Sequence, residues 1–200
     1  MDLSMKQNAY YEQSLEAEVY PHLKAALGLI DPLLPKIAVD AGCGAGRDAL
    51  FLVGQGFTVY AFDKNEAAIE RLREQNRAGF CDRLIVQVDS FEAFEYPKAA
   101  LISACSSLFF CHPQLFPRAW ENISHSLMPG GIFCGHFMGP GDSWAKMDRG
   151  DLTIHTRDEL NGLFGNYEVI DIYEHNAEGV TLLGRKKHWH TYSVVARKII

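Results

Sequence analysis

The sequence predicts an α/β protein built around a mainly parallel sheet, and three observations lead to that prediction. Short apolar segments alternate with helical segments along the chain, the order that right-handed strand–helix–strand units produce. A glycine-rich turn directly follows the first of these apolar segments. Aspartates stand at the ends of three successive segments, at Asp40, Asp63 and Asp89.

Helical spacing of apolar residues predicts an N-terminal helix over about residues 10–29, ended by Gly28 and the Asp31–Pro32 step. The short apolar runs that follow predict buried strands, with helices between them. Strands are expected at residues 36–40, 58–63, 84–88, 100–105 and 132–137, and helices at 47–55, 66–77 and 114–127. Residues 90–97 show too little periodicity for a helix, and Pro-Gly-Gly at 129–131 predicts a turn.

The C-terminal part predicts one more helix and two strands. The sequence TRDE at residues 156–159 is a capping box, which opens a helix that reaches about Phe164. Strands near residues 168–174 and 191–197, joined by a long loop, close the chain. A helix followed by a strand pair suggests that the last strand inserts antiparallel.

Length and composition predict a single domain over residues 1–200, with an N-terminal helical cover at 1–30 and an α/β core at 36–198. The hydrophobic share of 48% and charged share of 22% are ordinary for soluble proteins. A net charge of −6 argues against a nucleic-acid partner. The five cysteines show no CxxC spacing, and no apolar run approaches the roughly 18–20 residues of a membrane span. We therefore expect a cytoplasmic protein without a membrane partner, and the composition favours no oligomeric state.

The glycine turn, GCGAG at residues 42–46, indicates the class of ligand. Glycine is needed where φ is positive or where a ligand approaches the backbone. A dinucleotide turn normally reads GxGxxG, because a pyrophosphate sits at the helix N-terminus, but here Arg47 takes the place of the third glycine. S-adenosylmethionine (SAM) has no phosphate and carries an α-amino acid, whose ammonium suits Asp40. The turn therefore favours SAM over NAD, and a glycine loop without a ligand is the plainer alternative.

The aspartates at the strand ends support the same cofactor. Asp63, followed by Lys64, can accept hydrogen bonds from both ribose hydroxyls. Asp89 can accept one from the adenine amino group, with Phe91 packing on the ring. Each acid could instead cap the following helix, but three in succession are harder to explain in that way.

These segments resemble class I SAM-dependent methyltransferases over about residues 10–198. The matching segments are VDAGCGAG (39–46), VYAFD (59–63), VDS (88–90) and LMPGG (127–131). Within the class, the chain resembles the small tellurite-resistance (TehB-like) group through SACSSLFFCHP (103–113), GDSWA (141–145), KHWH (187–190) and VARK (195–198). The resemblance implies a Rossmann-like three-layer sandwich with a seven-stranded sheet whose last strand is antiparallel. One departure is Ala99-Ala100, where an acidic residue usually opens the fourth strand.

The turn, the acids and the resemblance together define the expected site. The resemblance implies that the backbone at Ala104 and the side chain of Cys105 border the methionine end of SAM. Tyr11, with its neighbour Tyr10, either covers the cofactor or packs in the core. The expected cofactor-binding residues are Asp40, Gly42, Cys43, Gly44, Gly46, Asp63, Lys64, Asp89, Ser90, Phe91, Ala104, Cys105 and Tyr11.

The acceptor is expected beyond the fourth and fifth strands, beside the sulfonium methyl group. The residues expected to face it are Phe109, Phe110, Cys111 and Trp144, with Asp142 nearby. His112 and His136 are the candidate bases, each with a purely structural alternative. His188 and His190 stand two residues apart without further ligands in sequence, so no metal site is expected.

Three functions are compatible with these residues. The leading prediction is a methyltransferase that moves the methyl group of SAM to a small molecule, such as a thiol, a chalcogen oxyanion or a metabolite, and releases S-adenosylhomocysteine (SAH). A SAM-binding sensor or partner module without transfer activity is the alternative from another class. An NAD-dependent oxidoreductase is the third.

Overall fold

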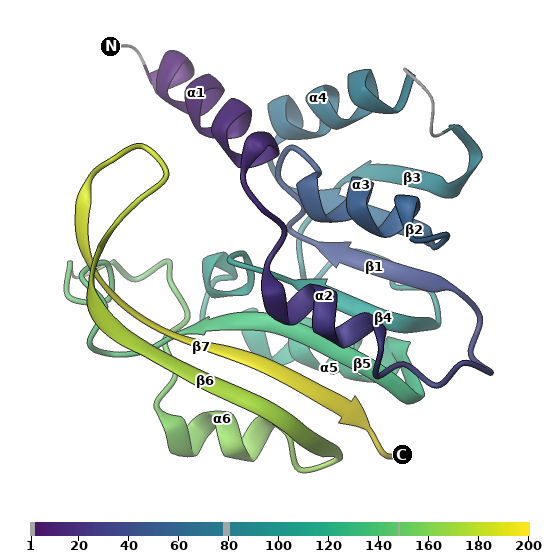
Figure 1. Ribbon diagram of the computed structural model, residues 1–200. Helices are drawn as coiled ribbons and strands as arrows, with labels where there is room; N and C mark the ends of the chain where they lie inside the picture. Colours follow the sequence, from purple (N-terminus) through teal and green to yellow (C-terminus); the bar gives the residue numbers. More distant parts are fainter. Residues whose placement is uncertain (1–2, 78–80, 148) are drawn as a thin grey trace.

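A computed structural model gives the structure of residues 3–77, 81–147 and 149–200. Seven strands form one sheet in the order β3-β2-β1-β4-β5-β7-β6 (Figure 1). The strands are β1 (Ile37–Ala41), β2 (Thr58–Asp63), β3 (Leu84–Val88), β4 (Ala99–Ala104), β5 (Leu127–Met138), β6 (Tyr167–Val180) and β7 (Lys186–Lys198). β7 runs antiparallel to both of its neighbours, and the other pairs are parallel. This topology confirms the predicted fold class.

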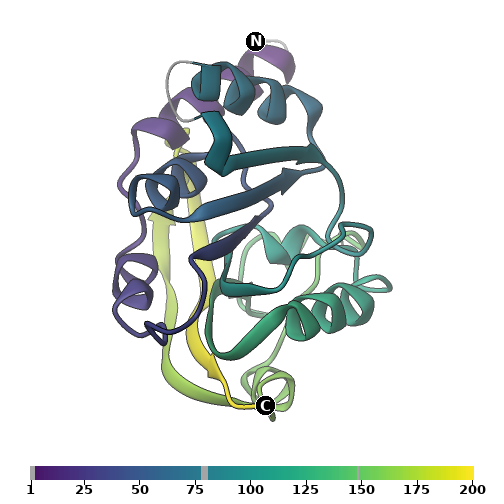
Figure 2. The same cartoon turned by 90° about the vertical axis from the view of Figure 1, so that its right-hand side faces the viewer.

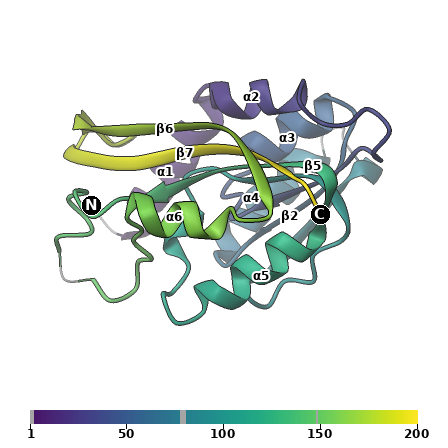
Figure 3. The ribbon, with the colours of Figure 1, turned by 90° about the horizontal axis from the view of Figure 1, so that it is seen from below.

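Helices cover both faces of the sheet and complete three layers (Figure 3). One face carries α2 (Pro21–Leu27), α3 (Arg47–Gly54) and α4 (Glu66–Arg77), and the other carries α5 (Phe116–Ser126) and α6 (Arg157–Leu163). Every residue of the central strand β4 is buried, because apolar side chains pack on it from both layers. Two single 3₁₀ turns lie at Cys81–Arg83 and Leu108–Phe110. No helix in the described ranges is both long enough and apolar enough to cross a membrane.

The N-terminal part differs from the prediction of one helix over residues 10–29. Two helices form instead, α1 (Leu3–Glu16) and α2, because Pro21 stands between them. Proline has no backbone N–H to give to a continuing helix but fits the first turn of a new one. Tyr11 of α1 packs against Ala45 and Ala68, so this helix covers the end of the sheet where the glycine turn lies.

The predicted turn at residues 129–131 was also wrong, because β5 runs through it. Gly130 adopts a φ of 81°, and the pairing of β5 with β4 shifts register between Ala99 and Leu101. The proline and glycines therefore make an irregularity inside the strand. In contrast, the capping box is confirmed: the Thr156 hydroxyl accepts the Glu159 N–H and the Glu159 carboxylate accepts the Thr156 N–H.

The C-terminal hairpin is much longer than the sequence predicts. Strands β6 and β7 have 14 and 13 residues and pair from Tyr167–Lys198 to Val180–Lys186, with a shift of register between Val169 and Asp171. The expected long loop is mostly strand, because β6 is an exposed edge strand without the alternating apolar pattern that would reveal it. The hairpin extends beyond the ends of the other strands of the sheet, toward α1 (Figures 1 and 2). Its tip, residues 181–185, thereby reaches the edge where β1 and β4 end.

Candidate functional site

The glycine turn between β1 and α3 has the backbone that its sequence predicts. Gly42, Gly44 and Gly46 have φ values of 72°, 54° and 97°, in the left-handed region. The N–H groups of Gly42 and Cys43 both donate to the Phe62 carbonyl at 2.9 Å, which ties the turn to β2. A Cβ atom on Gly44 would have no neighbour within 4 Å, so open space lies beside the turn at this position.

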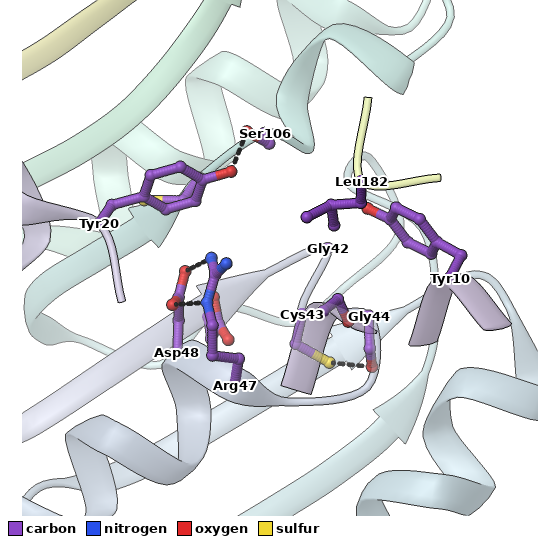
Figure 4. A pocket seen from close by; sticks show the side chains of 12 residues that line it. Tyr10, Tyr20, Gly42, Cys43, Gly44, Arg47, Asp48, Ser106 and Leu182 are labelled. Atoms are coloured by element: carbon purple, nitrogen blue, oxygen red, sulfur yellow. Dashed lines mark hydrogen bonds and ion pairs between the residues drawn. The ribbon is translucent and has the colours of Figure 1, made fainter. Parts of the chain in front are cut away.

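A cavity, called the inner cavity below, lies over this turn between the ends of β1 and β4 (Figure 4). It is lined by Tyr10, Ser14, Tyr20, Asp40, Gly42, Cys43, Gly44, Arg47, Asp48, Cys105, Ser106 and Leu182. Leu182 comes from the tip of the hairpin and Tyr10 from α1. Two segments that are distant in sequence therefore close one site over the glycine turn.

Asp40 gives the inner cavity a buried acid whose charged form requires a neighbouring cation. It is 3% exposed, and its Oδ2 atom has no hydrogen-bond partner among the described residues. Burial raises the pKa of Asp40 well above its usual range, and the nearby charge of Asp48 adds to this. A buried ligand ammonium would offset both effects, because a positive neighbour favours the carboxylate.

Arg47 supplies the opposite charge on the same wall. Its guanidinium makes two hydrogen bonds to Asp48, Nε to Oδ1 at 2.7 Å and Nη2 to Oδ2 at 3.0 Å. It also lies over the Tyr20 ring, 4.4 Å from the centroid. Asp48 takes only two of the N–H groups of Arg47, so the guanidinium keeps further donors for a ligand carboxylate. A zwitterionic α-amino acid can therefore place its ammonium at Asp40 and its carboxylate at Arg47. The charges of the inner cavity therefore fit the methionine end of SAM.

The acids predicted for the adenosine end lie beside the turn rather than in the inner cavity. The Asp63 carboxylate accepts the N–H groups of Gly44 at 2.9 Å and Asn65 at 2.8 Å. Asp89 accepts the Ser90 N–H and the Gln87 side-chain amide, each at 2.8 Å. Both acids thus order the local backbone, although each carboxylate oxygen retains a second lone pair.

The other expected cofactor residues are placed as follows. Phe91 is buried against Phe62, with ring centroids 5.7 Å apart. Tyr11 is buried against Ala45 and Ala68, and burial together with the charge of Asp63 raises its pKa to about 12. The remaining residues differ in how far solvent reaches them. Lys64 is exposed, Ser90 and Cys105 are half-buried, and Gly46 and Ala104 are buried.

A second cavity of about 510 Å³, the outer cavity, adjoins the first. It is lined by Tyr10, Tyr20, Ser106, Phe109, Phe110, Trp144, Val180, Thr181, Leu182, Leu183, Arg185 and Trp189. Three of the four residues predicted to face the acceptor, Phe109, Phe110 and Trp144, are in this set. The fourth, Cys111, is 3% exposed and lines neither cavity, and its thiol contacts the carbonyl of His112.

Tyr20 and Ser106 stand where the two cavities meet, and their hydroxyls are 2.6 Å apart (Figure 4). Ser106 adopts a φ of 56°. Among the described residues it is the one position other than glycine with a positive φ. Its N–H donates to His136 Nδ1 at 2.9 Å, which holds this strained turn in place.

The two candidate bases occupy different environments. Burial, together with the charges of His22 and Arg47, lowers the pKa of His136 to about 3. His136 is therefore neutral at pH 7, and its accepting nitrogen is already used by Ser106. His112 is exposed, lines neither cavity, and accepts the Gln114 N–H at 3.2 Å. His136 thus supports the turn at Ser106, and His112 lies outside both cavities.

The histidines also bear on the expectation that no metal is bound. His22, Cys105 and His136 each bring one potential ligand atom within 4.8 Å of the others. The Ser106 N–H donates to Nδ1 of His136, so the proton of the neutral ring is on Nε2. Binding a metal through Nε2 would move that proton to Nδ1, where it would meet the Ser106 N–H and break this hydrogen bond. His190 Nδ1 accepts the Gly141 N–H, and its Nε2 lies 2.9 Å from Glu174. His188 is similarly engaged with Glu178 and Asn176 in the hairpin.

One family model and one curated relative match this chain in sequence. The family model described as "Tellurite resistance protein TehB" matches residues 3–135. A probable cobalt-precorrin-6B C(15)-methyltransferase (decarboxylating) from Pyrobaculum aerophilum is 41% identical over 85 residues, which are 38% of this chain and 43% of that protein. This chain thus spans less than half of that curated relative.

Solved structures share the fold over almost the whole chain. TehB from Haemophilus influenzae has a TM-score of 0.75 at 18% identity, covering 96% of this chain and 67% of that one. Burkholderia thailandensis 1,6-didemethyltoxoflavin-N1-methyltransferase, solved with 1,6-didemethyltoxoflavin and SAH, has a TM-score of 0.65 at 20% identity, covering 100% and 82%. At these identities the likeness demonstrates the fold alone.

Proposed function

Because this chain belongs to the TehB family of SAM-dependent methyltransferases, we propose that it methylates a small molecule held in the outer cavity. One observation carries this proposal: the inner cavity, whose charges fit the methionine end of SAM, shares Tyr10, Tyr20, Ser106 and Leu182 of its lining with a second cavity. SAM supplies a methyl group on a sulfonium, a leaving group that is already activated. The chain's own contribution is then proximity and orientation, which can lower the barrier by several kcal/mol.

We assign the cofactor contacts from the charges and the turn. Asp40 faces the ammonium of SAM and Arg47 its carboxylate, while Gly42 and Gly44 let the ligand approach the backbone. Asp63 keeps free lone pairs for the ribose hydroxyls, and Asp89 for the adenine amino group. The other expected residues, Cys43, Gly46, Lys64, Ser90, Phe91, Ala104, Cys105 and Tyr11, surround these contacts.

The outer cavity favours an enzyme over a SAM-binding sensor, because a sensor has no need of a second chamber beside the methyl group. In the Burkholderia thailandensis enzyme a comparable fold holds a small heterocycle together with SAH. The family's name refers to tellurite, which adds a chalcogen oxyanion to the possible acceptors. An oxidoreductase is disfavoured, because Arg47 occupies the place where a pyrophosphate-binding turn has its third glycine.

Calorimetry tests the cofactor assignment directly. SAM and SAH should bind with a 1:1 stoichiometry, and NAD should show no binding under the same conditions. Binding of NAD without binding of SAM would overturn the proposal. If SAM binds but no acceptor is ever methylated, the sensor function is the better account.

Replacing Asp63 with alanine should weaken SAM binding by about 1–3 kcal/mol, because the ribose loses a charged hydrogen-bond acceptor. Calorimetric titration of both proteins gives this difference. Asp171, an exposed aspartate on β6, is the matched control, and its replacement with alanine should leave the affinity unchanged. An unchanged affinity for D63A would remove Asp63 from the site.

A further inference from the structure

The inner wall of the outer cavity is a row of aromatic rings. Phe109 and Phe110 have centroids 4.7 Å apart, Phe110 and Trp144 are 6.0 Å apart, and Trp144 and Trp189 are 5.7 Å apart. Phe109 and Phe110 come from the 3₁₀ turn at Leu108–Phe110, Trp144 from the loop after β5, and Trp189 from β7. They therefore form a continuous apolar surface that offers stacking contacts to a planar ligand.

The hairpin tip supplies apolar side chains that solvent still reaches. Val180, Leu182 and Leu183 all line the outer cavity, with exposed fractions of 63%, 45% and 36%. Exposed large apolar side chains gathered around a cavity usually mark a binding site. A ligand with apolar surface would bury them, whereas a hydrated ion would not.

The polar groups of the outer cavity are few. Among the described residues that line the outer cavity, Arg185 is the one with a cationic side chain. Lys187 lies behind the wall, between the rings of Trp144 and Trp189 at 4.3 and 3.7 Å, and is bonded to the buried carboxylate of Asp142. Its charge is therefore already paired. An inorganic oxyanion is normally held by several N–H donors, from Arg, Lys or a helix N-terminus, and this lining does not provide them.

We infer, on the basis of the proposed function, that the methyl acceptor is a molecule with an apolar ring system and not an inorganic oxyanion. Its ring lies against Phe110 and Trp144, and its nucleophilic atom is placed beside the hydroxyls of Tyr20 and Ser106. A volume of about 510 Å³ suits a ring-bearing metabolite and is far larger than an oxyanion needs.

The transfer step then needs no base from the protein. For a thiol acceptor, the deprotonated sulfur bonds to the methyl carbon, and the sulfonium–methyl bond breaks with its electron pair remaining on the cofactor sulfur. The products are a methyl thioether and SAH, and the thiol proton goes to solvent before the step. Tyr20 and Ser106 share one hydrogen bond, so one hydroxyl proton of the pair is free to donate to the acceptor atom.

Binding to the protein saturated with SAH tests this inference without requiring turnover. The probes are benzenethiol, 2-mercaptoethanol and sodium tellurite, each titrated by calorimetry. Benzenethiol should bind at least about tenfold more tightly than either of the others, because only its ring buries the aromatic wall and the hairpin tip. Equal binding of the two thiols, or tighter binding of tellurite, would overturn the inference.

Variants locate the binding surface. W144A and L183S should each weaken benzenethiol binding by about fivefold or more, while their SAH affinity stays unchanged. Leu183 is at the hairpin tip, so its replacement cannot open the core if W144A proves unstable. Y173A is the control, because Tyr173 is an exposed aromatic residue on the same hairpin that lines neither cavity. If Y173A weakens binding as much as L183S, the ring does not lie in the outer cavity.

Methyl transfer provides a separate readout. Tritiated SAM and benzenethiol should give labelled methyl phenyl sulfide. Tight ring binding without labelled product would count against the proposed function and leave the binding inference standing. Labelled product from tellurite at a higher rate than from benzenethiol would count against the inference alone.

Discussion

Replacing Gly46 with alanine is expected to destabilise the protein by roughly 2–5 kcal/mol. Its φ of 97° costs an L-residue about 1–2 kcal/mol. In addition, a Cβ atom here would lie 2.2 Å from Leu72 Cδ1, a fully buried side chain of α4. Overpacking a core of this kind adds about 1–3 kcal/mol. Urea unfolding monitored by circular dichroism gives the difference in free energy.

Gly44 provides the matched control for this prediction. It has a positive φ of 54° in the same turn, but its Cβ position is open. G44A should therefore show only the backbone cost of about 1–2 kcal/mol. Equal losses for the two variants would mean that crowding against Leu72 contributes nothing.

The difference between these glycines also shows what the sequence could not provide. The pattern predicted a glycine turn with positive φ, which the structure confirms. It could not show that Gly46 faces α4 while Gly44 faces open space, since that depends on how two helices pack on the sheet. The same division holds for the fold: β2, α4 and β3 match their predicted bounds, because each is a short periodic segment with clear ends.

The differences between the predicted and the observed elements have local causes. Pro21 was overlooked as the first residue of a second helix, although proline in that position was a usable signal. The two strands of the hairpin were predicted, but their length was underestimated because β6 is mostly exposed and has no alternating apolar pattern. The hairpin tip is nevertheless the part that brings Leu182 and Arg185 to the site.

The acceptor side of the site was the least predictable. Tyr20 and Ser106 are separated by 86 residues, and their hydroxyls meet because α2 packs on β5 and β7. Asp40 and the glycines were predictable because they lie in one contiguous segment. Arg47 lies in that segment too, but the pattern marked it only as the absence of a glycine.

Replacing Asp40 with asparagine should raise stability and lower SAM affinity at the same time. The two side chains have nearly the same shape, but asparagine is neutral at every pH, whereas Asp40 in the fold must either bind a proton or carry a buried charge that Asp48 repels. We expect the unfolding free energy at pH 8 to rise by about 1–3 kcal/mol. SAM should bind about 10–100-fold more weakly, because its ammonium loses a charged hydrogen-bond partner. Unfolding and calorimetry on the same preparations measure both quantities.

The pH dependence separates this explanation from a simple packing change. The folded protein raises the pKa of Asp40, so it holds a proton that the unfolded chain releases near pH 4. Stability should therefore fall as pH rises from about 4 through the folded pKa, and D40N should lose this part of the dependence.

SAM binding acts in the opposite direction, since its ammonium favours the charged carboxylate. Within that pH window, binding to the wild type should release a proton, which appears as a binding enthalpy that depends on the ionisation heat of the buffer. D40N should show less of this dependence. Proton release that is identical in both proteins would assign it to another group, and an unchanged SAM affinity would separate Asp40 from the ammonium altogether.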